Sequence, residues 1–520
     1  MSSCHLPLNL PASTGSPPYV CCPPAATYEP RLFRPNSSSS PRMRRAAHSV
    51  DEAYAAKLAQ AYALMKALPP DDPRSFIQQA NIHCAYCNTV YNQMGSSELF
   101  QIHNTWLFFP FHRWYIYFHE RILAKLLGED GDDPAFFLSF WNYDHPDGAS
   151  IPWLFSAAPA SSSRPHYPVL SNASRDSSHD SATATVALDF NGGDTDCRRR
   201  SIQLRENDNT MYRVLIRDAT TPESFFGWPY RQGDSPMEGY GFGTVEYCPH
   251  NTVHSWVGNK SAMGWRDMGA FFSSGLDPLF YAHHAQIDRL WELWKAMPNH
   301  EEIDDEDYKN AEFLFYNEEG ELVRVRAGDA SDASLLGYVY EEVETPWKDA
   351  IPEQRSFAPA ELGDGDAICE VGKVMEAKPC SVRVERDPEV SRASPWLHDH
   401  LVLSIDYQSQ MMVDVYLNLP AANATTDSGC KEFVTNIGHS HVASTPLDVK
   451  LDISERLVDL NLDISERLVD LNLTNESRIV VTLVPRIPLP YSSFQNLTIL
   501  DAYIECALPF QRWDGAHTLF

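Results

Sequence analysis

The sequence predicts a mainly α-helical domain followed by a separate β domain, with a proline- and serine-rich arm in front of both. Helical periodicity begins near Val50, where apolar residues recur at three-to-four spacing. Beyond about residue 380 the pattern changes to short apolar or alternating runs, which are typical of strands. Between the two, residues 348–377 are rich in proline, glycine and acidic residues, as interdomain linkers are. The chain has 520 residues, enough for about three structural units.

Three segments of the first domain predict long helices. Asp51 to Leu68 carries Ala, Tyr, Leu and Met at helical spacing and stops at Pro69-Pro70. Asn104 to Leu127 is the second segment, and Gln286 to Met297 is the third. Residues 158–200, which are rich in Ser, Asp and Arg, predict a long exposed loop.

Three short runs predict strands of the second domain: Leu401–Asp406, Met412–Leu417 and Ile479–Val484. An eleven-residue segment, 451–461, recurs without change at 462–472. Eleven residues make about three helical turns, so we expect that a second copy could extend a helix without rotating its apolar face far. Two copies are too few for a solenoid. We interpret the repeat as a local tandem duplication, or an artefact of sequence assembly, with no function of its own.

The net charge argues against nucleic acids and anionic membranes as partners, and the hydropathy argues against a transmembrane helix. Lys plus Arg number 41 and Asp plus Glu number 70, which gives a net charge of −29. Such a chain would repel the phosphates of nucleic acids and of anionic membranes. The most apolar stretch, Thr105–Phe118, is interrupted by His112 and Arg113, so we expect no transmembrane helix.

Five of the eleven cysteines fall in the first 90 residues, among them the adjacent pair Cys21 and Cys22. Neighbouring cysteines pair poorly with each other, so we expect these two to staple the arm to different partners in an oxidising compartment. Reduced thiols in a cytosolic protein are the alternative. Residues 1–20 show neither a basic region nor a long apolar core, so we expect no signal or transit peptide in this chain.

Two clusters of histidines carry the clearest chemical signal. The first cluster comprises His83, His103 and His112, and the second comprises His250, His254 and the adjacent pair His283 and His284. A single histidine on an apolar face is most often a packed core residue. Several together predict a metal site, because imidazole is a preferred ligand of copper and zinc.

The second cluster has a helical spacing. His250 and His254 are four residues apart, so on a helix they would share one face and could bind one ion. Pro249 suits the first turn of such a helix, and Glu246 would lie just before it, within reach of a metal-bound water. The sequence lacks His-Glu-x-x-His, which argues against a zinc protease.

Several motifs together resemble one family. They are His83-Cys-x-x-Cys87, Phe109-Pro-Phe-His112-Arg-Trp-Tyr115, Trp141-Asn-Tyr-Asp-His-Pro-Asp-Gly148, Pro249-His-Asn-x-x-His254 and Asp277-Pro-Leu-Phe-Tyr-Ala-His-His284. With these motifs in this order the chain resembles the plant polyphenol oxidases, which are type-3 copper enzymes of the tyrosinase and catechol oxidase kind. Asn310–Asn317 and Leu336–Trp347 are similar to a small family segment that follows the copper domain.

The resemblance implies a domain order. Residues 1–48 would form the disulfide-stapled arm and residues 49–307 a tyrosinase-like domain whose four-helix bundle holds a dicopper centre. Residues 308–347 would form the small family segment and residues 348–377 the linker. Residues 378–520 would form a β-sandwich-like domain that shields the active site.

The resemblance also implies the metal and its ligands. Two copper ions would be bound, copper A by His83, His103 and His112, and copper B by His250, His254 and His284. His283 would then lie beside the site as a hydrogen-bonded core residue. A thioether would join Cys87 to His103, and disulfides would join Cys4 to Cys22 and Cys21 to Cys84. Cys248 is a departure from the expected chemistry, since its thiol lies two residues before His250.

Three more residues are candidates for catalysis: Glu246, Asn251 and Phe271. Phe271 lies thirteen residues before His284, where the resemblance implies a ring that gates the copper site. Glu246 and Asn251 would hold a water that takes the proton of a monophenol. The alternatives are that Phe271 is a core aromatic residue and that Asn251 is a capping or solvent-facing residue.

The resemblance implies oxidation of o-diphenols to o-quinones, with O₂ reduced to water, and leaves open whether monophenols are hydroxylated. The partners would be a small phenol and O₂, and the enzyme would be latent until the C-terminal domain is removed. The alternatives are a dioxygen carrier with the same copper pair and an oxidase specialised for one phenolic metabolite. The family's location is the plastid, in the thylakoid lumen, while the missing targeting signal leaves the vacuole or another oxidising compartment open.

Overall fold

A computed structural model describes residues 21–507 apart from 22, 25, 36–40, 88–92, 94–101, 130–135, 158–163, 182, 190–198, 234–242, 260–265, 271, 299, 352–367, 376–377, 395–396, 408–410, 424–425, 427–429, 440–456 and 486–496. The chain divides into two compact units, and the described residues up to Ile351 belong to unit 1 and those from Ile368 onward to unit 2. Among the described helices, none is long and apolar enough to cross a membrane. Phe271, Cys4 and Cys22 lie outside the described residues, so the expectations for them stay untested.

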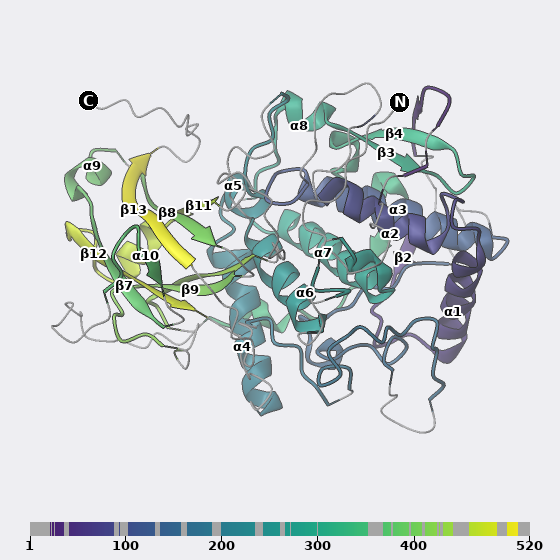
Figure 1. The fold of residues 1–520 in the computed structure, drawn as a ribbon, viewed down its shortest axis with the longest axis horizontal. Helices are drawn as coiled ribbons and strands as arrows, with labels where there is room; N and C mark the ends of the chain where they lie inside the picture. Colours follow the sequence, from purple (N-terminus) through teal and green to yellow (C-terminus); the bar gives the residue numbers. More distant parts are fainter. Residues whose placement is uncertain are drawn as a thin grey trace. The chain divides into compact units, whose positions relative to one another are not determined.

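The described part of unit 1 is mainly helical (Figure 1). Its helices are α1 (Glu52–Ala67), α2 (Phe76–Cys87), α3 (Phe108–Leu126), α4 (Arg200–Tyr212), α5 (Pro222–Phe226), α6 (Thr252–Val257), α7 (Leu279–Lys295) and α8 (Glu306–Asn310). Short helical turns are η1 (Pro146–Gly148), η3 (Arg213–Arg217), η4 (Glu246–Asn251), η6 (Ser274–Leu276), η7 (Gly328–Ala330), η8 (Ala333–Leu336) and η9 (Pro346–Asp349).

The three helices predicted from periodicity are present. α1 begins where the Asp51 carboxylate accepts the N–H of Tyr54 at 2.8 Å, as a helix N-cap does. α3 is buried from Phe108 to Ala124 on every face and runs through the centre of the unit. α7 begins seven residues before the predicted Gln286, because Asp277 accepts the N–H of Leu279 at 2.9 Å and starts the helix there.

The loop before α7 is braced from a distant segment. Both carboxylate oxygens of Asp277 accept hydrogen bonds from Arg175, each at 2.7 Å. Arg175 lies in the 158–200 segment, which was predicted to be an exposed loop. The described part of that segment has no helix before Arg200, yet Arg175, His179 and Leu188 are buried. The loop is therefore part of the core that supports the start of α7.

Short strands attach the N-terminal arm to the segment after the helices. β1 (Arg31–Leu32) lies parallel to β4 (Leu322–Arg326), which pairs with β3 (Glu312–Tyr316), and β2 (Arg42–Arg44) lies parallel to β5 (Tyr338–Tyr340). Cys21 forms a disulfide with Cys84 of α2, the pair that the resemblance implied. The arm is thus fixed covalently to the helix that carries His83.

Unit 2 is built of strands, with two short helices among its described residues. One sheet has the order β10-β9-β12-β7 and the other the order β11-β8-β13-β6, and all pairs are antiparallel. The strands are β6 (Val374–Met375), β7 (Cys380–Glu385), β8 (His398–Tyr407), β9 (Met411–Leu417), β10 (Phe433–His439), β11 (Leu457–Asp463), β12 (Arg478–Pro485) and β13 (Leu497–Ala507). The helices are α9 (Pro388–Arg392) and α10 (Ser465–Asp470). The three predicted strands lie in β8, β9 and β12, which confirms a separate β domain. A disulfide between Cys369 and Cys380, which was not predicted, closes a short loop there.

The duplicated segment does not form one extended helix, so that expectation was wrong. The end of the first copy, Leu457–Asn461, lies in β11, where Leu460 is paired with Leu403 of β8. The equivalent residues of the second copy begin inside α10, where Leu468 is buried. The same Leu-Val-Asp therefore forms a strand at 457–459 and a helix at 468–470, because tertiary contacts override a weak local preference.

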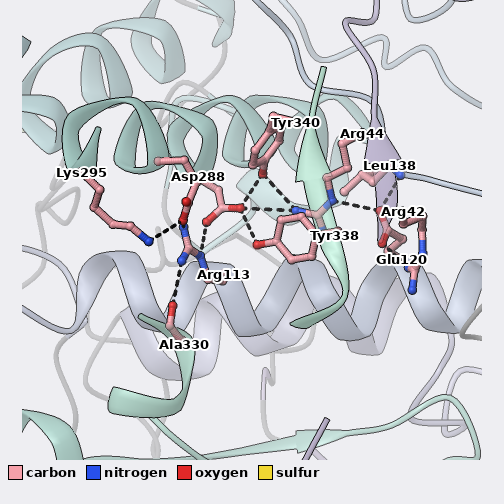
Figure 2. Close-up of polar contacts among 11 residues, drawn as sticks. Arg42, Arg44, Arg113, Glu120, Leu138, Asp288, Lys295, Ala330, Tyr338 and Tyr340 are labelled. Atoms are coloured by element: carbon pink, nitrogen blue, oxygen red, sulfur yellow. Dashed lines mark hydrogen bonds and ion pairs between the residues drawn. The ribbon is translucent and has the colours of Figure 1, made fainter. Parts of the chain in front are cut away.

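A buried ion cluster ties α3 to the arm (Figure 2). Glu120 of α3 accepts hydrogen bonds from Arg44 at 3.0 Å and from Arg42, both on β2. It also accepts the main-chain N–H of Leu138 at 2.6 Å. All three charged side chains are almost completely buried, so none of them can exchange its partner for water. Removing one partner from such a cluster leaves an uncompensated buried charge.

Replacing Glu120 should therefore destabilise the protein strongly. We expect Glu120→Gln to lower the free energy of unfolding at pH 7 by about 3–5 kcal/mol, because two buried guanidiniums lose their counter-charge. The matched control is Glu319→Gln, which breaks an exposed ion pair with Lys125 of the same helix and should cost at most about 1 kcal/mol. Urea unfolding followed by circular dichroism measures both, and similar losses in the two variants would contradict the prediction.

The same prediction has a pH dependence. Burial by itself raises the pKa of Glu120, but the Arg44 and Arg42 guanidiniums hold the pKa below its usual value. A carboxyl whose pKa is lowered by folding stabilises fully above its unfolded pKa, about 4.3, and this contribution is lost as the pH falls through the lower folded pKa. Wild type should therefore lose more stability than Glu120→Gln when the pH is lowered below about 4.3.

Candidate metal centre

Two groups of buried side chains meet the geometric requirements of a metal site in unit 1. One consists of His83, Cys87, His103 and His112, and the other of His250, His254, His283 and His284. Within each group the candidate ligand atoms lie within 4.8 Å of one another. All six histidines that the resemblance implied as ligands therefore lie in one of the two groups.

The first group comes from α2, the start of α3 and the chain between them. The ring centroids of His83, His103 and His112 are 5.3, 5.5 and 5.5 Å apart, so the three imidazoles form a nearly equilateral triangle. His83 is held from behind by a hydrogen bond between its Nδ1 and Ser274 Oγ at 3.1 Å. A Cβ at the next residue, Gly275, would lie 2.9 Å from Ala80 Cα, so only glycine lets η6 approach α2 this closely.

The second group comes from η4, α6 and α7. The ring of His250 lies 4.6 Å from that of His254 and 5.1 Å from that of His284. His254 Nε2 and His284 Nε2 are 3.4 Å apart, so both nitrogens converge on one point. His283 lies in the same group, 4.8 Å from His254 between ring centroids.

The helix expected over His250 and His254 is interrupted. α6 begins only at Thr252, and His250 lies in η4, in which Cys248 has an extended backbone. The Cys248 thiol donates a hydrogen bond to Leu188 O at 2.9 Å. Cys248 is therefore committed to a main-chain partner, as a core cysteine would be.

The two groups face each other across a short gap. His112 of the first group stacks on His284 of the second, with ring centroids 4.2 Å apart and planes 13° from parallel. His103 and His250 are 5.6 Å apart between centroids. Phe108 lies against the rings of both groups, 4.7 Å from His112 and 4.8 Å from His250. Two ions bound here would thus be close neighbours within apolar surroundings.

The electrostatics suit metal binding through neutral imidazole. Burial lowers the pKa of His112, His250 and His284 well below the usual value and that of His254 to about 4. His112 Nδ1 donates to Phe108 O and His254 Nδ1 to Met268 O, each at 2.7 Å. A proton on Nδ1 leaves the Nε2 lone pair free for a metal, and a carbonyl partner fixes that tautomer. Three imidazoles in the first group, and those of His250, His254 and His284 in the second, fit copper.

Cys87 lies beside the first group. Its sulfur is within 4.8 Å of the ligand nitrogens of the three histidines, and burial raises the pKa of its thiol well above the usual value. Cys87 is therefore placed near His103, as the expected thioether requires, but the structure contains it as a free cysteine. The covalent link stays a prediction.

Glu246 connects the two groups. Both of its carboxylate oxygens accept the main-chain N–H of Asn104, at 2.8 and 2.9 Å. Asn104 directly follows His103 and has a positive φ of 66°. Burial raises the pKa of Glu246 well above its usual value, while the Asn104 N–H acts in the opposite direction. A carboxyl from η4 thus reaches the backbone beside a histidine of the first group.

Asn251 also contacts a histidine. Its Oδ1 accepts a hydrogen bond from His250 Nδ1 at 2.9 Å, and the side chain is buried. The solvent-facing alternative for Asn251 is therefore wrong, since the amide lies inside the site. It supports the tautomer of His250 in the way that carbonyl oxygens support His112 and His254.

A third group, His48, His145 and Asp147, also has ligand atoms within 4.8 Å of one another. It is only partly buried, and the Asp147 side chain is 74% exposed. His48 Nδ1 bonds with Asn142 Oδ1 at 2.6 Å, and His145 Nδ1 accepts the N–H of Asp147 at 3.2 Å. Both Nδ1 atoms already have hydrogen-bond partners within the protein.

Sequence reasoning missed two charged residues beside the histidines. Arg113 follows His112 directly, and Asp288 lies four residues after His284, on the same face of α7. Arg113 Nε donates to Asp288 Oδ1 at 2.5 Å. The sequence did offer one signal for these two residues: each lies next to, or one helical turn from, an expected copper ligand.

Family models match three consecutive parts of the chain. The common central domain of tyrosinase matches residues 73–297, the polyphenol oxidase middle domain residues 302–353, and the chloroplastic polyphenol oxidase C-terminal domain residues 379–500. The candidate metal centre thus lies within the part that matches tyrosinase.

Individual relatives agree with these matches. Aureusidin synthase of Antirrhinum majus is 45% identical over 342 residues, which cover 65% of this chain and 58% of that protein. A chloroplastic polyphenol oxidase of Malus domestica is 37% identical over 507 residues, 92% of this chain and 80% of that protein. The solved structure of latent apple tyrosinase has a TM-score of 0.76 at 33% identity and covers 92% of this chain and 100% of that one.

The matches extend through both units, and the buried histidines supply the donors that a dicopper centre needs. The chain therefore belongs to the plant polyphenol oxidases, copper-dependent enzymes that oxidise phenols at a type-3 pair of copper ions.

Proposed function

We propose that this protein oxidises o-diphenols to o-quinones. Two catechols would each give up two electrons and two protons, and one O₂ would be reduced to two molecules of water. The observation that carries the proposal is the pair of facing, buried histidine triads, joined by the stacked rings of His112 and His284. The copper pair would supply the binding and reduction of O₂, and the protein would supply position, neutrality and exclusion of water.

His83, His103 and His112 would bind copper A, and His250, His254 and His284 would bind copper B. The approach of His254 Nε2 to His284 Nε2 favours His284 over His283 as the third ligand of copper B. The stacking of His284 on His112 supports the same choice, because it turns His284 toward the first triad. Cys87 would form the thioether with His103, which fixes the orientation of that imidazole.

The ligand assignment predicts the copper content of variants. His112→Ala and His254→Ala should each lose about half of the bound copper and essentially all oxidase activity, since a triad reduced to two imidazoles leaves its ion weakly held. His166→Ala, which changes an exposed histidine, serves as the control. Metal analysis of purified protein measures the content, and two retained copper ions in either ligand variant would refute the assignment.

Glu246 and Asn251 would act on monophenols. A monophenol must lose its proton before it can bind copper as phenolate, and a water between the two side chains could take that proton. Glu246 is buried 2.8 Å from the Asn104 N–H, and its remaining lone pairs can still accept from a water. Asn251 Oδ1 lies 2.9 Å from His250 Nδ1, which places the amide beside an expected ligand of copper B.

The water-base hypothesis predicts a selective loss. Asn251→Gly should lower monophenol turnover about 10²-fold, the typical contribution of general base catalysis, and should lower catechol turnover much less. Copper content is the control, because Asn251 also orients His250. An equal loss on both substrates with less copper would mean that Asn251 only positions its neighbour, and an activated wild type without monophenol activity would reject the hypothesis outright.

The identity of the natural phenol is a further proposal. The relative named aureusidin synthase is 45% identical over the matched part, which favours a specialised plant phenolic as substrate beside simple catechols. We also propose a plastid location, because several relatives are named chloroplastic. Phe271 would gate copper B, and Phe271→Ala would then change KM and substrate preference.

We further propose that the protein is latent. The structure of latent apple tyrosinase matches this chain over both units. The C-terminal domain, residues 378–520, would restrict access of phenols to the copper centre. The linker 348–377 is the expected cleavage site, since its composition is typical of exposed, protease-sensitive segments.

Latency predicts activation by limited proteolysis. Cleavage in residues 348–377 should raise the initial rate of catechol oxidation, with the copper content unchanged. Mass spectrometry locates the cut, and an oxygen electrode measures the rate before and after it. A variant with a protease site of known specificity inserted in the linker gives the matched experiment, and an unchanged rate after complete cleavage would contradict latency.

A further inference from the structure

Asp288 lies where the two histidine groups are closest. It is one helical turn after His284 on α7, and its partner Arg113 is the residue after His112 on α3. The rings of His112 and His284 stack at 4.2 Å between centroids. The ion pair between α3 and α7 therefore lies next to His112 and His284, the two histidines that stack across the gap between the groups.

The Arg113 side chain is fixed from every side. Beside the bond to Asp288, it donates to Glu292 Oε1 at 2.6 Å and to Ala330 O at 2.8 Å. Its guanidinium carbon lies 3.8 Å from the ring centroid of Trp291. Arg113 is completely buried, so its position defines where α7 can lie relative to α3.

The Asp288 carboxylate is equally constrained (Figure 2). One oxygen accepts from Arg113, and the other accepts from the hydroxyls of Tyr338, at 2.6 Å, and Tyr340. Arg44 Nη1 approaches the second oxygen at 3.4 Å. The two tyrosines belong to β5, in the part of the chain that matches the polyphenol oxidase middle domain. That segment thus holds Asp288 in the orientation that Arg113 requires.

We propose that Asp288 is a positioning residue of the dicopper centre, which fixes the separation of His112 and His284 through Arg113 and is itself oriented by Tyr338 and Tyr340. The proposal rests on the ligand assignment above. It differs from a role in stability alone, because it makes the spacing of the two ions, and not only the melting temperature, depend on one carboxylate. The middle segment would then be part of the metal scaffold.

Asp288→Asn tests the proposal in the copper-loaded, full-length protein. Asparagine keeps an oxygen for the tyrosine hydroxyls but loses the charge that holds Arg113. The matched control is Glu318→Gln. Glu318 is buried, lies in the same middle segment and forms an ion pair with Arg121, also on α3, with Arg121 Nε and Glu318 Oε2 3.0 Å apart. No expected ligand is adjacent to Arg121 or Glu318.

The decisive readout is magnetic. Two Cu(II) ions held close together couple and give little electron paramagnetic resonance signal, whereas ions whose spacing has loosened give a signal. We expect Asp288→Asn to retain copper, to show this signal and to lower kcat about 10- to 100-fold with little change of KM, because ångström-scale misplacement has effects of this size. Glu318→Gln should lower the melting temperature similarly but show neither change.

A second variant covers the case in which Asp288→Asn does not fold. The double change Tyr338→Phe and Tyr340→Phe leaves the ion pair intact and removes only the hydroxyls that orient Asp288. We expect this double variant to show a weaker electron paramagnetic resonance signal than Asp288→Asn. If every folded variant keeps a silent spectrum and wild-type kcat and loses only thermal stability, Asp288 is structural and the proposal is wrong. Wild type without two bound coppers would instead reject the ligand assignment itself.

Discussion

The buried ion pair between Arg113 and Asp288 is the interaction on which the arrangement of unit 1 depends. It joins the two central helices at the level of the histidines and recruits strand β5 through tyrosine hydroxyls. The hydrophobic effect is non-directional, whereas a charged pair with several hydrogen bonds adds geometric specificity. A centre that must hold two ions at a defined separation needs the second kind of constraint.

Burial of the histidines serves two purposes through one physical cause. Removal from water is favourable for apolar side chains such as Phe108 and Phe280 and unfavourable for the charged form of imidazole. Neutral imidazole is the form that binds copper. Part of the polar cost of burying these rings is offset by oxygen partners for the Nδ1 atoms of His83, His112 and His254. Packing, protonation state and metal preference therefore follow from one low-dielectric site.

The sequence was sufficient for the features that depend on local pattern or on recognisable motifs. The long helices and the strands of unit 2 follow from apolar periodicity, and the histidines and the Cys21–Cys84 pair follow from motifs of the family. The irregular turn η4 could not be foreseen, because the four-residue spacing of His250 and His254 is that of a regular helix. A helix was expected across both histidines for that reason.

Long-range polar contacts were also beyond the sequence. The partners of Asp288 come from residues 44, 113, 338 and 340, and nothing in their local patterns links them. Arginine and tyrosine at such positions are ordinary surface residues until the fold buries them together. The buried Arg175, inside a segment with the composition of a loop, illustrates the same limit. The composition of a segment therefore does not predict which of its polar side chains the fold buries.

The duplicated segment bears on how such a chain can change in evolution. Its residues Leu-Val-Asp fit two patterns, because they form part of strand β11 in the first copy and part of helix α10 in the second. A stretch of gene that encodes both patterns can be copied in frame and still supply a strand from one copy and a helix from the other. A tandem duplication of this kind adds eleven residues without a new motif.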